Sequence, residues 1–229
     1  FVGKSMEFVY DNKPTSCFET DSSYDIAFKR MTTMIGALSE DVQLTYIVES
    51  FVGLSELAPH QATHYANWLA ELSPHPMARA LQGIRTRGLK SMVDHNPKAM
   101  IKVMDTLAWS DLPDENKMSL TLLHMLAESP ENDAVISFAG RNADQSPSHL
   151  ISTVGNNKTT LAARLVQHGQ AEAVMSLIEN MESTEQQVQL LSAKDSAGTP
   201  LVHALIKNDA QHSARLTQLI LNWGHSQGE

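Results

Sequence analysis

Cysteine is almost absent from this sequence, because Cys17 is the only one among 229 residues. A single cysteine excludes an internal disulfide and a thiolate-rich zinc site. It also favours a reducing compartment over an oxidising one. We therefore expect a cytoplasmic protein.

Aromatic residues are also scarce, at 6% of the chain, although hydrophobic residues together make up 42%. The core must therefore consist of Leu, Ile, Val, Met and Ala. This composition favours helices over a β-sandwich, whose strands are rich in β-branched and aromatic residues. A chain of this length can bury a core without the help of disulfides or metal ions.

Long apolar runs are missing, and none approaches the roughly 20 residues that a membrane-spanning helix requires. Basic residues are in deficit, with 17 Lys and Arg against 26 Asp and Glu and a net charge of -9. Neither half of the chain has a basic stripe, so nucleic acid and anionic membranes are not expected as partners. The chain starts at Phe1 without a signal-peptide pattern, and we expect it to be a piece of a longer protein.

The motifs of several enzyme classes are lacking too. No Gly-rich phosphate loop, Gly-x-Ser-x-Gly elbow or dinucleotide fingerprint occurs, so no catalytic residue and no cofactor is predicted. His60 and His64 have a spacing that suits a metal ion, but no Glu follows His60 as in a zincin helix and no third ligand is evident. No metal site is predicted. An ordinary loop thiol is the favoured interpretation of Cys17, with a nucleophile as the alternative.

The first half of the chain predicts an irregular arm followed by helices. Turn-forming residues dominate residues 1–24, where Glu7 to Tyr10 is interpreted as a strand. The spacing of apolar residues from Asp25 to Leu38 predicts a helix. Ser39, followed by two acidic residues, predicts the start of the next one, which could end at Gly53.

Prolines divide the next segment. Pro59 is expected to begin a helix that ends at the Ser73-Pro74-His75-Pro76 sequence, interpreted as a breaker. Residues 76–105 predict two more helices, divided near Asn96-Pro97.

The second half contains an internal repeat. Residues 190–201 align without gaps on residues 150–161, and Leu201-x-His203-x-Leu205 then matches Leu161-x-Ala163-x-Leu165. A third copy begins at Leu122 and a fainter one at Leu89. Because leucines four apart share one helical face and a second apolar stretch follows each copy, the pattern predicts helix–turn–helix units that must stack. His124 and His203 occupy equivalent positions and are expected to be framework residues bonded to neighbouring backbone.

One copy resembles the opening of an ankyrin repeat. Asp195-Ser196-Ala197-Gly198-Thr199-Pro200-Leu201 is similar to the family's Asp-x-x-Gly-x-Thr-Pro-Leu-His. In the preceding copy, the stretch from Gln167 to Val174 is similar to the family's Asn-Gly-His-x-Glu-Val-Val segment. His203 lies one residue later than in the family, and the 39 to 40 residue spacing exceeds the usual period of about 33. Another α-solenoid therefore stays open as an alternative.

The resemblance implies a mainly α fold, in which a helical N-terminal region (1–88) precedes a stacked, ankyrin-like array (89–229). It implies a protein-interaction module, and such arrays also occur in bacterial effectors that are secreted into a host cytosol. The alternative is a fragment of an effector enzyme, cysteine protease-like or protein-modifying, whose repeats recruit substrate. The partner-binding residues that it implies lie before and on the first helix of two copies: Asn156, Asn157, Arg164, Gln167, His168, Lys194, Asp195, Lys207 and Asn208.

Overall fold

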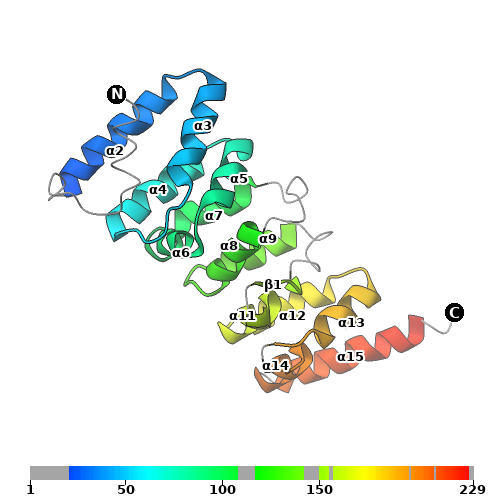
Figure 1. Ribbon diagram of the computed structural model, residues 1–229. Coiled ribbons are helices and arrows are strands. Elements are labelled where there is room, and N and C mark those ends of the chain that lie inside the picture. The colour runs from blue at the N-terminus through cyan, green and yellow to red at the C-terminus, as the bar shows by residue number, and fades with distance from the viewer. Residues whose placement is uncertain are drawn as a thin grey trace. The chain divides into compact units, whose positions relative to one another are not determined.

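A computed structural model describes residues 21–107, 117–141, 150–154, 157–195, 197–208 and 210–226 (Figure 1). These ranges contain thirteen helices and one two-stranded hairpin, which confirms the mainly helical fold. None of the described helices is long and apolar enough to cross a membrane. The chain divides into two compact units, unit 1 (Phe1–Ser119) and unit 2 (Leu120–Glu229).

Unit 1 is built from consecutive helix pairs. Its helices are α2 (Asp21–Gly36), α3 (Glu40–Phe51), α4 (Pro59–Glu71), α5 (Pro74–Gly83), α6 (Thr86–His95) and α7 (Pro97–Thr106). Helix α4 packs on α6 and α3 packs on α5, so that successive pairs stack. The helix predicted from Asp25 starts four residues earlier in the structure, at Asp21.

Polar residues start several of these helices as the sequence predicts. Ser39 precedes α3, whose first turn carries Glu40 and Asp41 close to the positive end of the helix dipole. Asn96 separates α6 from α7, and its side-chain oxygen accepts a hydrogen bond from the backbone N–H of Ala99 at 3.3 Å. The predicted division at Asn96-Pro97 is therefore confirmed.

The prediction of a breaker at Ser73-Pro74-His75-Pro76 is wrong in one respect. Pro74 begins α5 and Pro76 lies in its first turn, where a missing N–H removes no intrahelical hydrogen bond. Residues 76–105 also contain a second division, at Ile84-Arg85. There the backbone N–H of Arg85 donates to the carbonyl of Leu54 at 3.0 Å, which ties the loop after α3 to the loop after α5.

Unit 2 also consists of helix pairs, with one additional helix. The pairs are α8 (Lys117–Ala127) with α9 (Asp133–Arg141), α11 (Leu161–Gln167) with α12 (Ala171–Glu179), and α14 (Leu201–Asn208) with α15 (Ala210–Ser226). The additional helix is α13 (Thr184–Ser192), between α12 and α14 in the chain. Helix α11 packs on α14, and α12 packs on α9, α14 and α15.

The repeated leucines form the core of unit 2. Six leucines at the predicted positions are at most 1% exposed: Leu122, Leu126, Leu161, Leu165, Leu201 and Leu205. The two leucines of each repeat copy lie on the first helix of a helix pair. Helices α9, α12 and α15 follow as the predicted second helices.

The boundary between the units differs from the predicted one. The sequence divides the chain after residue 88, but this position lies inside α6, which packs on α4. The division in the structure falls between Ser119 and Leu120. The faint copy that begins at Leu89 therefore belongs to the same compact unit as the N-terminal helices.

Candidate protein-interaction surface

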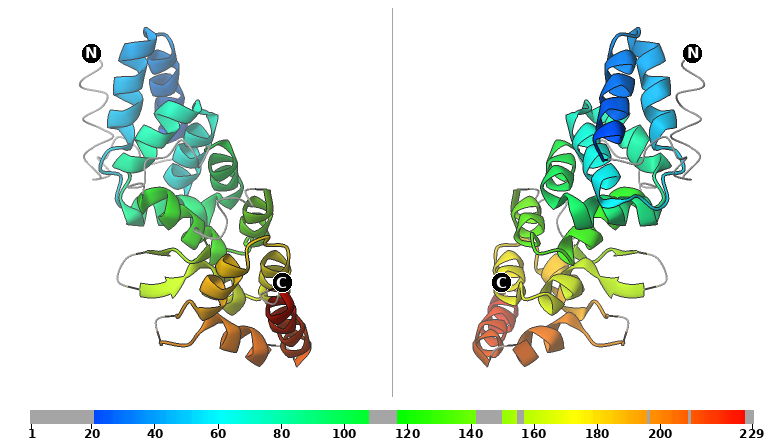
Figure 2. Two further views of the ribbon diagram at one scale, coloured as in Figure 1. Left: turned by 90° about the vertical axis from the view of Figure 1, so that its right-hand side faces the viewer. Right: turned by 90° about the vertical axis from the view of Figure 1, so that its left-hand side faces the viewer.

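A reversal of the chain precedes the first helix of two pairs in unit 2. Before α11, strand β1 (Thr153–Val154) pairs antiparallel with β2 (Asn157–Thr160), and Thr153 lies opposite Thr160. Before α14, an isolated antiparallel bridge joins Lys194 to Pro200. Both reversals project from the same side of unit 2, as the yellow-green and orange loops in Figure 2 show.

The reversal before α14 is shaped by Asp195 and Gly198. One carboxylate oxygen of Asp195 accepts hydrogen bonds from the backbone N–H groups of Ala197 at 2.9 Å and Thr199 at 2.8 Å. Gly198 has a φ of 79°, a left-handed conformation that glycine adopts without steric cost. Asp195 is half-buried, and its carboxylate binds the backbone of its own turn. Its contacts therefore give it a structural role.

In the helix pair α11–α12, a threonine caps the first helix and a glycine makes the turn to the second. The hydroxyl of Thr160 accepts a hydrogen bond from the N–H of Ala163 at 3.2 Å and caps α11. Gly169, with a φ of 91°, makes the turn to α12 that the sequence predicts. The side chains just before it, Gln167 and His168, are exposed.

Seven of the nine predicted contact residues, all except Arg164 and Asp195, fall into three groups. Gln167, His168, Lys194 and Lys207 are exposed. Asn157 lies in β2 and Asn208 is the last residue of α14. Asn156 lies outside the described residues. Gln167 and His168 lie at the end of α11, and Lys207 lies in the last turn of α14, which packs on α11.

Arg164 differs from the other predicted contact residues because it is engaged within the chain. Its guanidinium forms an ion pair with Glu128, which follows α8, and its side chain is only 13% exposed. Its Nε is buried without a hydrogen-bond partner among the described residues. This geometry assigns Arg164 to the contact between α8 and α11.

His124 lies beside this ion pair in the interior of unit 2. It is 3% exposed, and its Nε2 lies 3.4 Å from the hydroxyl of Ser152. Burial, and then the nearby Arg164 guanidinium, lowers the pKa of His124 to about 4. His124 is therefore a neutral framework residue, as expected, and its contacts with Ser152 include a hydrogen bond with the backbone of that residue. His203 at the equivalent position is exposed.

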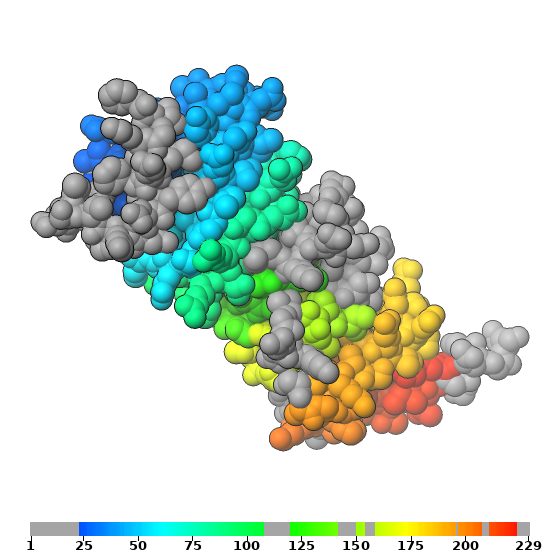
Figure 3. Space-filling view, in the orientation of Figure 1, coloured from blue at the N-terminus to red at the C-terminus, as the bar shows by residue number. Residues whose placement is uncertain are grey.

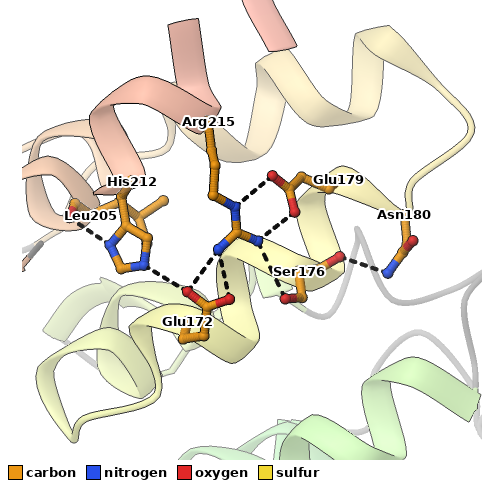
Figure 4. Close-up of polar contacts among 7 residues, drawn as sticks. All are labelled: Glu172, Ser176, Glu179, Asn180, Leu205, His212 and Arg215. Carbon is orange, nitrogen blue, oxygen red and sulfur yellow. Dashed lines mark hydrogen bonds and ion pairs between the residues drawn. The ribbon is translucent and has the colours of Figure 1, made fainter. Parts of the chain in front are cut away.

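A polar network joins α12 to α15 and was not predicted from the sequence (Figure 4). Arg215 donates to Glu172 at 2.6 Å and to Glu179 at 2.8 Å, and His212 bridges the Leu205 carbonyl and the Glu172 carboxylate. The hydrogen bonds from Arg215, and then that from His212, lower the pKa of Glu172. Because these residues are about 40 positions apart, only the repeat register could have paired them. The network joins one helix pair to the next.

Unit 1 contains a second cluster with titratable groups, where α2 meets α4. The Nε2 of His64 lies 2.5 Å from a carboxylate oxygen of Asp25, and the ring of Tyr24 lies 5.1 Å from that of His60. Burial, and then the Asp25 carboxylate, raises the pKa of Tyr24. No group of three potential metal ligands occurs among the described residues. Cys17 and the predicted strand Glu7 to Tyr10 lie outside the described residues.

Comparison of the chain with protein-family models, curated proteins and solved structures gives no match. The interpretation of unit 2 therefore depends on its own residues and contacts.

Proposed function

We propose that this chain is a protein-interaction module whose partner binds the side of unit 2 that carries the two reversals and the helices α11 and α14. The observation that supports this most is the projection of both reversals from one side, each followed by a helix with fully buried leucines (Figure 2). Polar side chains on such a repeated scaffold lose little conformational freedom on binding. Gln167 and His168 at the end of α11 and Lys194 before α14 are exposed and are the leading contact residues.

The proposal includes an ankyrin-like character for the array. A reversal, a Thr-Pro-Leu or Thr-Thr-Leu start and a helix pair occur in the order of the ankyrin pattern, and a glycine makes the turn between the helices α11 and α12. The additional helix α13 accounts for the long spacing between the copies that begin at Leu161 and Leu201, because it lies between α12 and the reversal before α14. By the same resemblance we propose a bacterial effector that acts on host proteins in the host cytosol.

Affinity capture with the full chain, followed by quantitative binding of the captured protein, tests the proposed surface. The informative variant combines Lys194→Glu with Gln167→Glu, and its matched control combines Thr217→Glu with Gln218→Glu on the exposed side of α15. The first variant should weaken binding tenfold or more, which is about 1.4 kcal/mol. The control should bind normally, and both variants should keep the melting temperature of the wild type.

Equal binding by the wild type and both variants would remove the proposed surface. Intact mass spectrometry of the captured protein tests the alternative class at the same time. A covalent change in the partner that depends on Cys17, and disappears in Cys17→Ser, would identify an effector enzyme instead.

A further inference from the structure

The outward face of α14 is exposed at positions that are buried in the two preceding first helices. Counted from the first repeated leucine, the third and sixth residues are His124 and Ala127 in α8, and Ala163 and Val166 in α11. These four side chains are 3%, 0%, 2% and 3% exposed. The same positions in α14 are His203, which is exposed, and Ile206, which is 42% exposed.

The interior copies show what covers these positions. Over His124 lie Ser152, which precedes β1, and Arg164 of α11, so the next helix pair closes the face. Over α11 lies α14 of the following pair. Helices α14 and α15 form an edge of unit 2, as the orange and red atoms in Figure 3 show. The exposed face of α14 therefore continues a stacking interface that the chain already forms.

The charged residue at the border of this face is Lys207, whereas the residue at the equivalent position after α8 is Glu128. Glu128 lies six residues after Leu122 and forms an ion pair with Arg164, which lies three residues after the first leucine of α11. The residue six positions after Leu201 is Lys207, which is exposed and forms no ion pair among the described residues. A partner helix placed in the same register against α14 would therefore meet Lys207 where Arg164 of α11 meets Glu128.

We propose that Val202, His203 and Ile206, with Lys207 at the border, form a docking surface for a helix of a partner protein that presents leucines four residues apart and a carboxylate three residues after the first of them. The leucines would cover His203 and Ile206, and the carboxylate would pair with Lys207. This surface is the outward face of α14 and contains none of Gln167, His168 and Lys194, so the two proposals stand or fall separately.

Two helix-stapled, fluorescein-labelled peptides test the docking surface. Both copy residues 159–170, which include the whole of α11; one keeps Arg164 and the other carries Arg164→Glu. Fluorescence anisotropy with the full chain should show at least fivefold tighter binding of the glutamate peptide. In the Lys207→Glu chain the arginine peptide should bind more tightly than the glutamate peptide, because position 207 then carries the negative charge that Glu128 has after α8.

Ile206→Asp keeps the test independent of folding, because this side chain is exposed and the variant should melt like the wild type. It should lose binding of both peptides. Failure of both peptides to bind the wild type, equal affinities, or binding that survives Ile206→Asp would overturn the proposal. Sedimentation that shows a dimer abolished by Ile206→Asp would overturn it in favour of a second copy as the occupant.

Discussion

His124 shows how one side chain can make unit 2 sensitive to acid. It is enclosed by Ser152 and by the Glu128–Arg164 ion pair, and its Nδ1 has no hydrogen-bond partner among the described residues. A second positive charge beside Arg164 would be poorly solvated there. The folded state therefore prefers the neutral imidazole, whose pKa of about 4 lies below the ordinary value of 6.5.

The pH dependence of stability follows from this preference. Below pH 6.5 the unfolded chain binds a proton at His124 that the folded chain does not, so the free energy of unfolding falls as the pH drops from 6.5 towards 4. The loss should approach about 3 kcal/mol. Urea unfolding at pH 7 and pH 4.5, monitored by circular dichroism, should show a smaller loss for His124→Gln than for the wild type.

The control for this experiment is His203→Gln, because His203 occupies the equivalent position but is exposed. Its pH dependence should equal that of the wild type. If His124→Gln behaves in the same way as this control, then His124 does not account for the acid sensitivity.

Gly88 is a residue of unit 1 at which a side chain does not fit. A Cβ atom there would lie 2.5 Å from the carbonyl oxygen of Leu54, a backbone atom that cannot rotate away. We expect Gly88→Ala to lower the free energy of unfolding by about 1–3 kcal/mol, since α6 must move away from the loop after α3. Gly36→Ala is the control, because no heavy atom lies within 4 Å of its Cβ position. Similar chemical denaturation midpoints for the two variants would contradict the close approach.

Among the elements, α13 fastens two helix pairs together through one glutamine. The amide of Gln187 donates to the carbonyls of Ile178 and Met181, both at 3.0 Å, at the end of α12. Its oxygen accepts a hydrogen bond from the indole N–H of Trp223 on α15 at 2.7 Å. The inserted helix thus satisfies orphan carbonyls of one helix and the buried donor of another.

Replacement of Gln187 should therefore be costly. Gln187→Ala leaves two carbonyls and an indole N–H without this partner, and we expect the free energy of unfolding to fall by about 1–3 kcal/mol. Gln189→Ala, on the exposed side of the same helix, should change it by less than about 0.5 kcal/mol. Urea denaturation of both variants measures the difference, and a Gln187→Ala variant as stable as Gln189→Ala would show that α13 does not hold the pairs together.

The sequence predicts some elements and misses others for physical reasons. The helices with repeated leucines follow from apolar residues four apart, which must be buried together. Helix α13 was not predicted, because its sequence is rich in glutamine and the leucines at its end, Leu190 and Leu191, were assigned to the repeat block before α14. The hairpin β1–β2 was missed because its strands are two and four residues long, with no alternation of apolar and polar residues.

For the candidate site, the position of a residue in the repeat predicts the exposure of several side chains but not which contacts they make. Repeat position correctly places Gln167, His168, Lys194 and Lys207 at the surface. It does not show that Arg164 forms an ion pair with Glu128 or that Asp195 holds its own turn, because both depend on contacts outside the aligned motif. The exposure of His203, in contrast to His124, likewise depends on whether another helix pair covers it.

For the whole molecule, the main consequence is a division of roles within unit 2. The buried leucines and the α12–α15 network hold the helix pairs together, whereas Lys194 before α14 and the side chains at the ends of α11 and α14 are exposed. Variants in the first group should change stability, and variants in the second group should change binding. Unit 1 has its own core around Phe28, Phe51 and Tyr65.

Hydrogen–deuterium exchange of the full chain, with and without the captured partner, tests the proposed binding side most directly. We predict that the partner slows exchange in residues 150–170 and 193–208, while exchange in residues 21–107 and in the exposed part of α15 stays the same. Protection confined to residues 21–107, with the reversals of unit 2 unchanged, would contradict it and would place the contact on the helix pairs of unit 1.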